Sequence, residues 1–321
     1  MRFLLSFCLL FIYSFGLAQP LQFYQMEHVQ MGTLFRLDFY ASSDSIAQKA
    51  AKAAFNRLDE LNAVFSNYDA ESELSQIGLG DTEISEDLYQ VLVIAQEVHR
   101  QTDGAFDITI GSLSKLWRRA IRQQRFPSKK QIENAKNKVD ATLLRLQKEP
   151  KRQLRLAKEM QLDAGGIAKG YALDVMLNIL QEHGIVHALL DGGGDLLLGE
   201  SPPGKEGWNV QIPKGIEEDS VIFKPYLLAN CAIASSGDWY RYLEWEGQRY
   251  SHIIDPRTGQ ALSHQAIVTT IHPKAVIADA YASAYSVLAN EEIEKYQTRY
   301  PIKVQILLKT KDKTLKKGCL F

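Results

Sequence analysis

The stretch LDAGGIAKGYALD at residues 162–174 reads as the end of a strand, a glycine turn and the first turns of an amphipathic helix. Gly165 and Gly166 can adopt positive φ and let a bulky ligand approach the backbone closely. The free N–H groups and positive dipole end of the following helix favour a phosphate at this point. Lys169 adds a mobile cation, and Asp163 adds a carboxylate. An ordinary strand–turn–helix junction would look the same locally, and the P-loop pattern G-x-x-x-x-G-K-[ST] is absent.

The whole chain has 321 residues, 45% of them hydrophobic, which is enough for one large domain or two smaller ones. Its 37 basic and 38 acidic residues leave no basic excess, which argues against a nucleic-acid-binding protein. The basic run at residues 309–317 is typical of a solvated edge. Because no repeat, long linker or low-complexity tract divides the chain, we expect one α+β unit.

Residues 1–18 have the pattern of a secretory signal. Arg2 is followed by an apolar core at residues 3–15 and a small-residue cleavage site at residues 16–18. No later stretch reaches the length of about 18 apolar residues that a membrane span needs. The sequence therefore predicts an exported, periplasmic protein with its folded domain at residues 19–321, soluble or loosely attached to the periplasmic face of the inner membrane. Cleavage would leave Cys231 and Cys319, whose pairing stays open.

Caps and periodicity outline the secondary structure. Ser43 or Asp44 caps a helix whose apolar face runs from Ala47 to Phe65, Ser85 begins a second helix, and Ser128 with Gln131 marks a capped surface helix. Further helices are expected at residues 169–183 and 275–288, with a helical turn at residues 111–119. Strands are expected at residues 35–40, 188–190, 208–212, 230–236, 249–251, 267–271 and 304–308, the last closing the fold, and hairpin strands lie between residues 136 and 161.

Three further clusters could carry chemistry. In GAFD at residues 104–107, the simplest interpretation is that Phe106 belongs to the hydrophobic core and that Asp107 caps a turn. In HIIDPRTG at residues 252–259, a turn sequence follows His252. His252 could also be a histidine in a strand whose ring makes its hydrogen bonds within the fold. In ADAYASA at residues 278–284, Asp279 and Ser283 are four apart and share one helix face. Their oxygen atoms are hard ligands that suit Mg²⁺. An acid near the start of a helix and a serine on its surface, without any metal, would have the same spacing.

In this order, the motifs resemble the ApbE family of bacterial flavin transferases, which move FMN from FAD onto a protein. The resemblance extends over residues 31–288 and includes MGT at residues 31–33, FSNY at 65–68, SELS at 72–75, TDGAFD at 102–107 and DGGGD at 191–195, besides the three clusters at 163–174, 252–259 and 278–284. The most specific matches are His-x-x-Asp-Pro-x-Thr-Gly and Gly-Ile-Ala-Lys-Gly-Tyr.

The resemblance implies roles for the matching residues. The FAD site would be lined by Met31, Tyr68, Ala105, Phe106, Asp107, Asp163, Lys169 and His252. Mg²⁺ would be held by a backbone carbonyl at or beside Gly166, the Asp279 carboxylate and the Ser283 hydroxyl. His252 and Asp279 would be the catalytic residues, with His252 near the diphosphate or the acceptor hydroxyl. Ser283 stands where the family commonly has Thr, and Ala164 stands where a larger residue is common.

The resemblance thus implies that residues 19–321 form a flavin transferase catalytic domain. This enzyme would use Mg²⁺ to transfer the FMN phosphoryl group of FAD to a Ser or Thr hydroxyl of an acceptor protein, for example a membrane redox subunit, and release AMP. Two alternatives remain: a Mg²⁺-dependent FAD pyrophosphatase that yields FMN and AMP, and an exported flavin-binding protein without catalysis. A dinucleotide-dependent oxidoreductase is disfavoured because no strand–GxGxxG–helix unit occurs.

Overall fold

A large antiparallel sheet organises the chain. The computed structural model describes residues 20–217, 220–237, 242–289, 293–300, 302–309 and 314–320, so the expected signal at residues 1–18 lies outside the described residues. The sheet has eight strands in the order β1, β2, β6, β7, β10, β13, β14, β15, and its neighbouring strands all pair antiparallel. The strands are β1 (Gln22–Gln30), β2 (Thr33–Ala41), β6 (Ala188–Gly192), β7 (Leu196–Leu198), β10 (Cys231–Gly237), β13 (Gln265–His272), β14 (Lys303–Lys309) and β15 (Thr314–Cys319).

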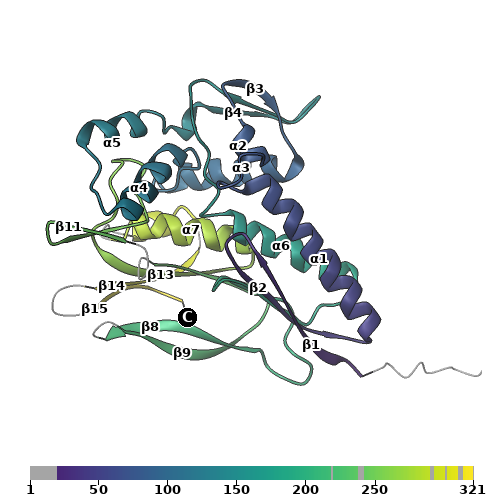
Figure 1. Ribbon diagram of the computed structural model, residues 1–321. Helices are drawn as coiled ribbons and strands as arrows, with labels where there is room; N and C mark the ends of the chain where they lie inside the picture. The colour runs from purple at the N-terminus through teal and green to yellow at the C-terminus, as the bar shows by residue number, and fades with distance from the viewer. Residues whose placement is uncertain are drawn as a thin grey trace, which may run out of the picture.

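Three helices, α1 (Asp44–Phe65), α6 (Ala168–Glu182) and α7 (Ala275–Val287), lie on one face of this sheet, as Figure 1 shows. The hairpin β8 (Trp208–Glu217) and β9 (Ser220–Leu228) covers the opposite face, where Trp208, Val210 and Ile212 pack against Leu189, Leu198 and Ile233. The central strands of the sheet are therefore buried on both sides, whereas β1 and β15 at its edges are largely exposed or half-buried. The sheet together with the helices confirms the expected α+β fold.

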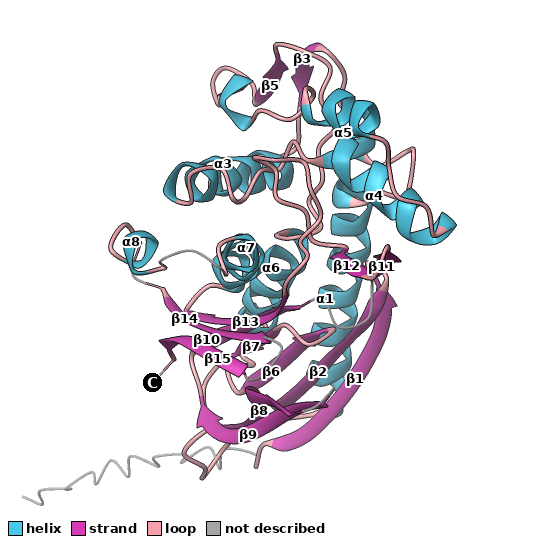
Figure 2. Ribbon diagram, turned by 90° about the vertical axis from the view of Figure 1, so that its left-hand side faces the viewer, coloured by secondary structure: helices cyan, strands magenta, loops and turns pink. Residues whose placement is uncertain are grey.

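A second layer lies above these helices (Figure 2). It contains α2 (Glu73–Gln76), α3 (Glu86–Gln101), α4 (Gly111–Gln123), α5 (Lys129–Lys136), the 3₁₀ helix η1 (Ala141–Leu143) and the small sheet β3 (Gly80–Glu83), β5 (Gln153–Leu156), β4 (Leu144–Gln147). The hairpin β11 (Tyr242–Trp245) and β12 (Gln248–Ser251) packs against α4, and α8 (Glu294–Gln297) precedes β14. Among the described residues, no helix is long and apolar enough to span a membrane.

Small residues bring α6 and α7 close together. A Cβ atom on Gly170 of α6 would lie 2.3 Å from the carbonyl oxygen of Ala275, so only glycine fits at this crossing. Asp174, one turn further along α6, accepts hydrogen bonds from the backbone N–H groups of Ala275 (2.8 Å) and Val276 (2.9 Å). Because Lys274 at the N-cap of α7 makes no capping bond with its own side chain, Asp174 supplies the missing acceptor. The two helices are thereby fixed at their N-terminal ends.

The predicted caps are confirmed. Ser43 accepts from the Ile46 N–H, Ser85 caps α3, and Ser128 with Gln131 forms a complete capping box at the start of α5. The apolar face predicted for α1 is buried along its whole length. These features depend on short-range patterns, which is why the sequence predicts them correctly.

Several predicted elements differ in the structure. Residues 162–164 are irregular and not a strand end, because Gln161 forms only one isolated bridge, to Ile110. Helix α4 continues to Gln123 instead of stopping after a turn. β14 is not the last strand, because part of the basic run expected as a solvated edge pairs with it as β15. Cys231 and Cys319 are not joined in a disulfide among the described residues.

Candidate active site

A pocket of about 1030 Å³ opens beside the N-terminal part of α6. Its walls come from the β1–β2 turn, the loop after α1, residues 105–110, α4, the turn before β7, the end of β10, the loop at residues 252–256 and α7. Every residue that the sequence analysis assigned to FAD or Mg²⁺ lines this one pocket: Met31, Tyr68, Ala105, Phe106, Asp107, Asp163, Gly166, Lys169, His252, Asp279 and Ser283. The fold thus brings together residues that are up to 252 positions apart.

Two carboxylates hold Lys169 in place. Its Nζ contacts the Oδ2 of Asp195 and lies 3.8 Å from the Oδ2 of Asp279. Burial by itself would lower the pKa of Lys169, but the charges of Asp279 and Asp195 raise it above its usual value. Asp195 is kept in position by the Ser235 N–H, which donates to its Oδ1 at 3.2 Å. Lys169 is therefore a fixed cation, and not the mobile one that the sequence suggested.

Asp279 is a buried carboxylate with an unused oxygen. Burial raises its pKa to about 6, and the negative charge of Asp195 adds to this effect, while Lys169 and the Gly170 N–H act against it. Its Oδ2 accepts from the Gly170 N–H at 3.1 Å. Within the described part of the chain, its Oδ1 accepts no hydrogen bond. A buried, incompletely compensated carboxylate is a good ligand for an additional cation.

Gly166 and Ser283 face each other next to this carboxylate. Ser283 follows Asp279 by one helical turn, and a Cβ atom on Gly166 would lie only 2.7 Å from the Ser283 Oγ. Glycine therefore lets the backbone of the turn approach the hydroxyl. The described residues contain no group of three or more His, Cys, Asp or Glu side chains that could hold a metal ion. The donors available here are one carboxylate, one hydroxyl and backbone oxygen, a set of hard ligands that fits Mg²⁺.

The carboxylate of Asp163 holds the glycine turn at residues 165 and 166 in place. Asp163 accepts from the Gly165 N–H at 2.9 Å, from the Asn67 side chain and from Arg118 at 3.3 Å. The N–H groups of Ile167 and Ala168 donate to the carbonyl of Ala164. Together with the Gly170 bond to Asp279, these contacts use most of the N–H groups that the sequence suggested for a phosphate.

Sequence reasoning missed Arg118, which connects two predicted site residues. Its guanidinium pairs with Asp163 and lies 5.0 Å from the centre of the Tyr68 ring. The Tyr68 side chain is largely exposed at the pocket mouth. The only sequence signal for this contact is the position of Arg118 on the hydrophilic side of an amphipathic helix, which does not identify a partner 45 positions away.

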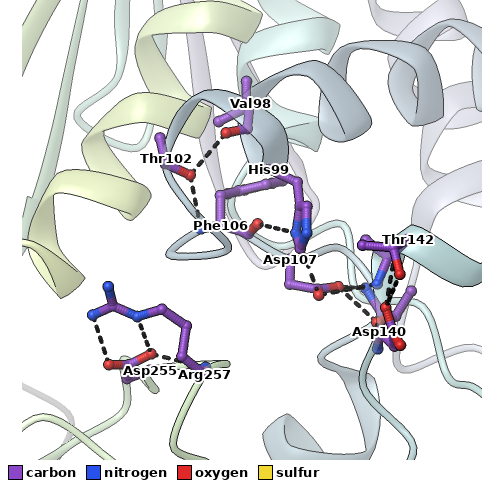
Figure 3. A network of polar contacts seen from close by, with 11 residues as sticks. Val98, His99, Thr102, Phe106, Asp107, Asp140, Thr142, Asp255 and Arg257 are labelled. Carbon is purple, nitrogen blue, oxygen red and sulfur yellow. Dashed lines mark hydrogen bonds and ion pairs between the residues drawn. The ribbon is translucent and has the colours of Figure 1, made fainter. Parts of the chain in front are cut away.

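A polar network holds the loop that carries Phe106 (Figure 3). Asp107 accepts from the N–H (2.8 Å) and hydroxyl (2.6 Å) of Thr109 and from the Ala141 N–H (3.1 Å). The Nδ1 of His99 lies 3.0 Å from the Phe106 carbonyl and 3.4 Å from Asp107. These bonds tie the carboxylate of Asp107 to its own loop and to η1, so that it positions Phe106 against the pocket.

His252 reaches the pocket just ahead of the predicted turn. The Thr258 N–H and the Gly259 N–H both donate to the Asp255 carbonyl, which closes the turn. The Asp255 carboxylate also accepts two bonds of 2.9 Å from the Arg257 guanidinium, as Figure 3 shows. This rigid turn fixes where the segment carrying His252 enters the pocket.

Comparisons with known proteins agree with this site. The family model described as "ApbE family" matches residues 31–308. A protein named FAD:protein FMN transferase from Escherichia coli is 28% identical, with 89% of this chain and 84% of the relative covered. A protein of the same name from Treponema pallidum is 30% identical over 84% of this chain and 80% of its own length. The solved flavin transferase ApbE from Vibrio cholerae superimposes with a TM-score of 0.81 at 25% identity, covering 94% of this chain and 98% of that one. The chain thus belongs to the ApbE family.

Proposed function

We propose that this chain is a Mg²⁺-dependent FAD:protein FMN transferase that acts on a Ser or Thr hydroxyl of an acceptor protein and releases AMP. Family membership and the names of the relatives support the general activity: the chain is an enzyme that transfers flavin from FAD to a protein. The choice of metal rests on the chemistry of the pocket, and the choice of a Ser or Thr hydroxyl rests on the resemblance to the family. The observation that carries the choice of metal is the buried carboxylate of Asp279, which faces the pocket with Ser283 and Gly166.

In the proposed reaction, the acceptor oxygen attacks the phosphorus on the FMN side of the FAD diphosphate. A new P–O bond forms to the Ser or Thr side chain, the bridging P–O bond breaks, and AMP leaves with the bridging oxygen. The hydroxyl proton must pass to a base. His252 is the candidate, because it lines the pocket and an imidazole ordinarily titrates near neutral pH.

The other pocket residues would bind and orient the substrate. Lys169, fixed between Asp195 and Asp279, keeps a positive charge beside the diphosphate without having to move. Phe106 offers an apolar surface, and Tyr68 an aromatic ring, for the flavin or the adenine. The oxygen ligands of Gly166, Asp279 and Ser283 would hold Mg²⁺, which supplies charge neutralisation on the phosphate oxygens when it is bound.

Two other functions can use the same pocket. With water in place of the acceptor hydroxyl, the enzyme would be an FAD pyrophosphatase that produces FMN and AMP. A flavin-binding protein without catalysis is disfavoured because binding alone would require neither the pair of oxygen ligands Asp279 and Ser283 nor His252 in the pocket.

Mass spectrometry of the products separates these functions. The protein is mixed with FAD and Mg²⁺, with and without an acceptor protein that exposes a Ser or Thr. AMP together with a flavinylated acceptor is the expected result. AMP with free FMN alone would favour the pyrophosphatase, and retained FAD without AMP would favour the binding protein.

We also propose that the enzyme works outside the cytoplasm, in the periplasm. The support for this proposal is the signal-like composition of residues 1–18. Fractionation of cells that express the full chain tests it, since cytoplasmic enzyme with an uncut N-terminus would contradict export.

A further inference from the structure

Helix α4 separates its charges from its apolar residues. Lys115, Arg119 and Arg122 follow one another at helical spacing and are exposed, and no residue of α4 is acidic. The buried side of the helix consists of Leu113, Leu116, Trp117 and Ala120. The exposed side of α4 is therefore a cationic face, which the near-zero net charge of the whole chain conceals.

The same charge continues beyond the helix. Arg125 and Lys130 are exposed, and residues 111–139 contain nine basic residues but one acidic residue, Glu133. Within the described part of the chain, Lys115, Arg119, Arg122 and Arg125 form no ion pair. This cationic face, defined here as Lys115, Arg119, Arg122, Arg125 and Lys130, thus keeps most of its charge available for a partner.

The cationic face extends to the mouth of the active-site pocket. Arg122 lines the pocket, as does Arg118, which pairs with Asp163 inside it. A partner bound along α4 would therefore already lie at the entrance through which an acceptor hydroxyl must pass. A cationic patch elsewhere on the surface would not bring the partner to the pocket entrance.

An exposed aromatic residue packs against Phe126, which directly follows Arg125 of the cationic face. Trp245 at the end of β11 is 38% exposed, and its ring lies 6.3 Å from that of Phe126, which follows α4. Trp and Arg are among the residues that contribute most often to strong contacts between proteins. Their combination here is more typical of a protein interface than of a merely solvated helix.

We propose, on the basis of the proposed transferase function, that the cationic face binds an acidic surface of the acceptor protein and presents its hydroxyl to the pocket. A protein partner is favoured over an anionic membrane because the apolar side of α4 packs into the fold, with only Ile121 partly exposed, and offers no continuous apolar stripe to insert into lipid. Electrostatic attraction would mainly raise the rate at which the acceptor binds.

Charge reversal tests this surface. The variant Lys115→Glu/Arg119→Glu/Arg125→Glu leaves both pocket arginines in place. The control Lys49→Glu/Lys52→Glu/Lys205→Glu reverses three exposed lysines that lie outside α4 and outside the pocket lining. The acceptor used is the protein that the wild-type enzyme labels with flavin in a cell extract, purified after detection by flavin fluorescence in a gel.

Initial rates give separate KM values for acceptor and for FAD. We expect the KM for the acceptor to rise about tenfold in the α4 variant at low salt, and the difference to shrink as salt is added. The KM for FAD should stay within about twofold, as should both values in the control. An unchanged KM for the acceptor would overturn the proposal.

Vesicles that contain phosphatidylglycerol provide the second measurement. If the wild-type enzyme sediments with them and the α4 variant does not, while both use the acceptor equally well, the face binds membrane and the proposal is wrong. If the wild-type enzyme labels no protein at all, the transferase function itself fails, which is a different outcome from an α4 variant with normal kinetics.

Discussion

The backbone N–H of Gly170 on α6 donates a 3.1 Å hydrogen bond to the Oδ2 of Asp279 on α7. Asp174 strengthens this connection by capping the first N–H groups of α7. The carboxylate of Asp279 is therefore placed by two packed helices, and its position depends on backbone atoms. A charge so deeply buried costs free energy in the folded protein, which leads to the first prediction.

Replacing Asp279 by Asn should stabilise the metal-free protein at pH 7.5. The pKa of Asp279 is raised to about 6 in the folded state, against about 4 in an unfolded chain, so ionisation destabilises the fold by on the order of 2 kcal/mol. This figure already includes the attraction of Lys169, which acts against the rise in the pKa of Asp279. Thermal unfolding of the wild type and the variant measures the difference.

The size of this effect depends on pH. Because the folded-state pKa is raised, the wild type loses stability as the pH rises from about 4 to about 6, and the Asn variant should not show this loss. Mg²⁺ should raise the unfolding temperature of the wild type and leave that of the variant unchanged. Asp195→Asn serves as a contrast and should destabilise the protein, because Lys169 loses its closest partner.

Gly166→Ala should weaken Mg²⁺ binding. The new Cβ would lie 2.7 Å from the Oγ of Ser283 and 3.2 Å from the Cβ of Ser283. The Ser283 hydroxyl must therefore move away from the other proposed metal ligands. We expect Mg²⁺ affinity, measured by calorimetry, to fall about 10- to 100-fold, as for a disturbed metal ligand. The control is Gly78→Ala, where an added Cβ meets nothing within 4 Å. Equal Mg²⁺ affinity in the two variants would rule out the proposed contact.

Asp107→Ala should destabilise the protein by about 3 kcal/mol, because three buried donors lose a charged acceptor. Chemical denaturation measures this change, and the KM for FAD should rise because Phe106 is no longer held. Asp81→Ala on the exposed strand β3 is the matched control, with an expected change below about 0.5 kcal/mol. Similar losses in both variants would show that the loop network carries no particular stability.

His252→Ala should lower kcat about 10²- to 10⁴-fold, the usual range for loss of a general base. The Kd for FAD should remain within about threefold, since the proposed role of His252 is proton transfer. Rapid-quench and equilibrium binding experiments separate the two parameters. A weaker FAD complex with a normal kcat would instead assign His252 to substrate binding.

Short-range sequence patterns predicted much of the fold. The caps at Ser43, Ser85 and Ser128 and the small-residue helix α7 are local features, and each is confirmed. The edge strands β1 and β15 were not predicted. In β1 the apolar Phe23 and Val29 are exposed while the polar Gln30 is half-buried, and in β15 Lys317 is half-buried, so neither strand alternates cleanly. The strand end predicted at residue 162 was wrong, since a glycine turn identifies the start of the helix but not what precedes it.

The site was predictable as a set of motifs, whereas its contacts were not. All residues assigned through the resemblance line one pocket. The partners that hold them are remote in sequence: Asn67 binds Asp163 from 96 positions away, and Asp174 caps a helix 101 positions later. A single sequence contains no local signal for such pairs, because each depends on how separate elements pack.

The most direct test of the central claim is the intact mass of a purified acceptor protein after incubation with FAD, Mg²⁺ and the enzyme. Wild-type enzyme should increase the mass of the acceptor by one FMN less one water and release an equal amount of AMP, whereas Asp279→Asn should leave the acceptor unchanged. An unmodified acceptor beside free FMN, or full modification by the Asp279→Asn variant, would contradict the account.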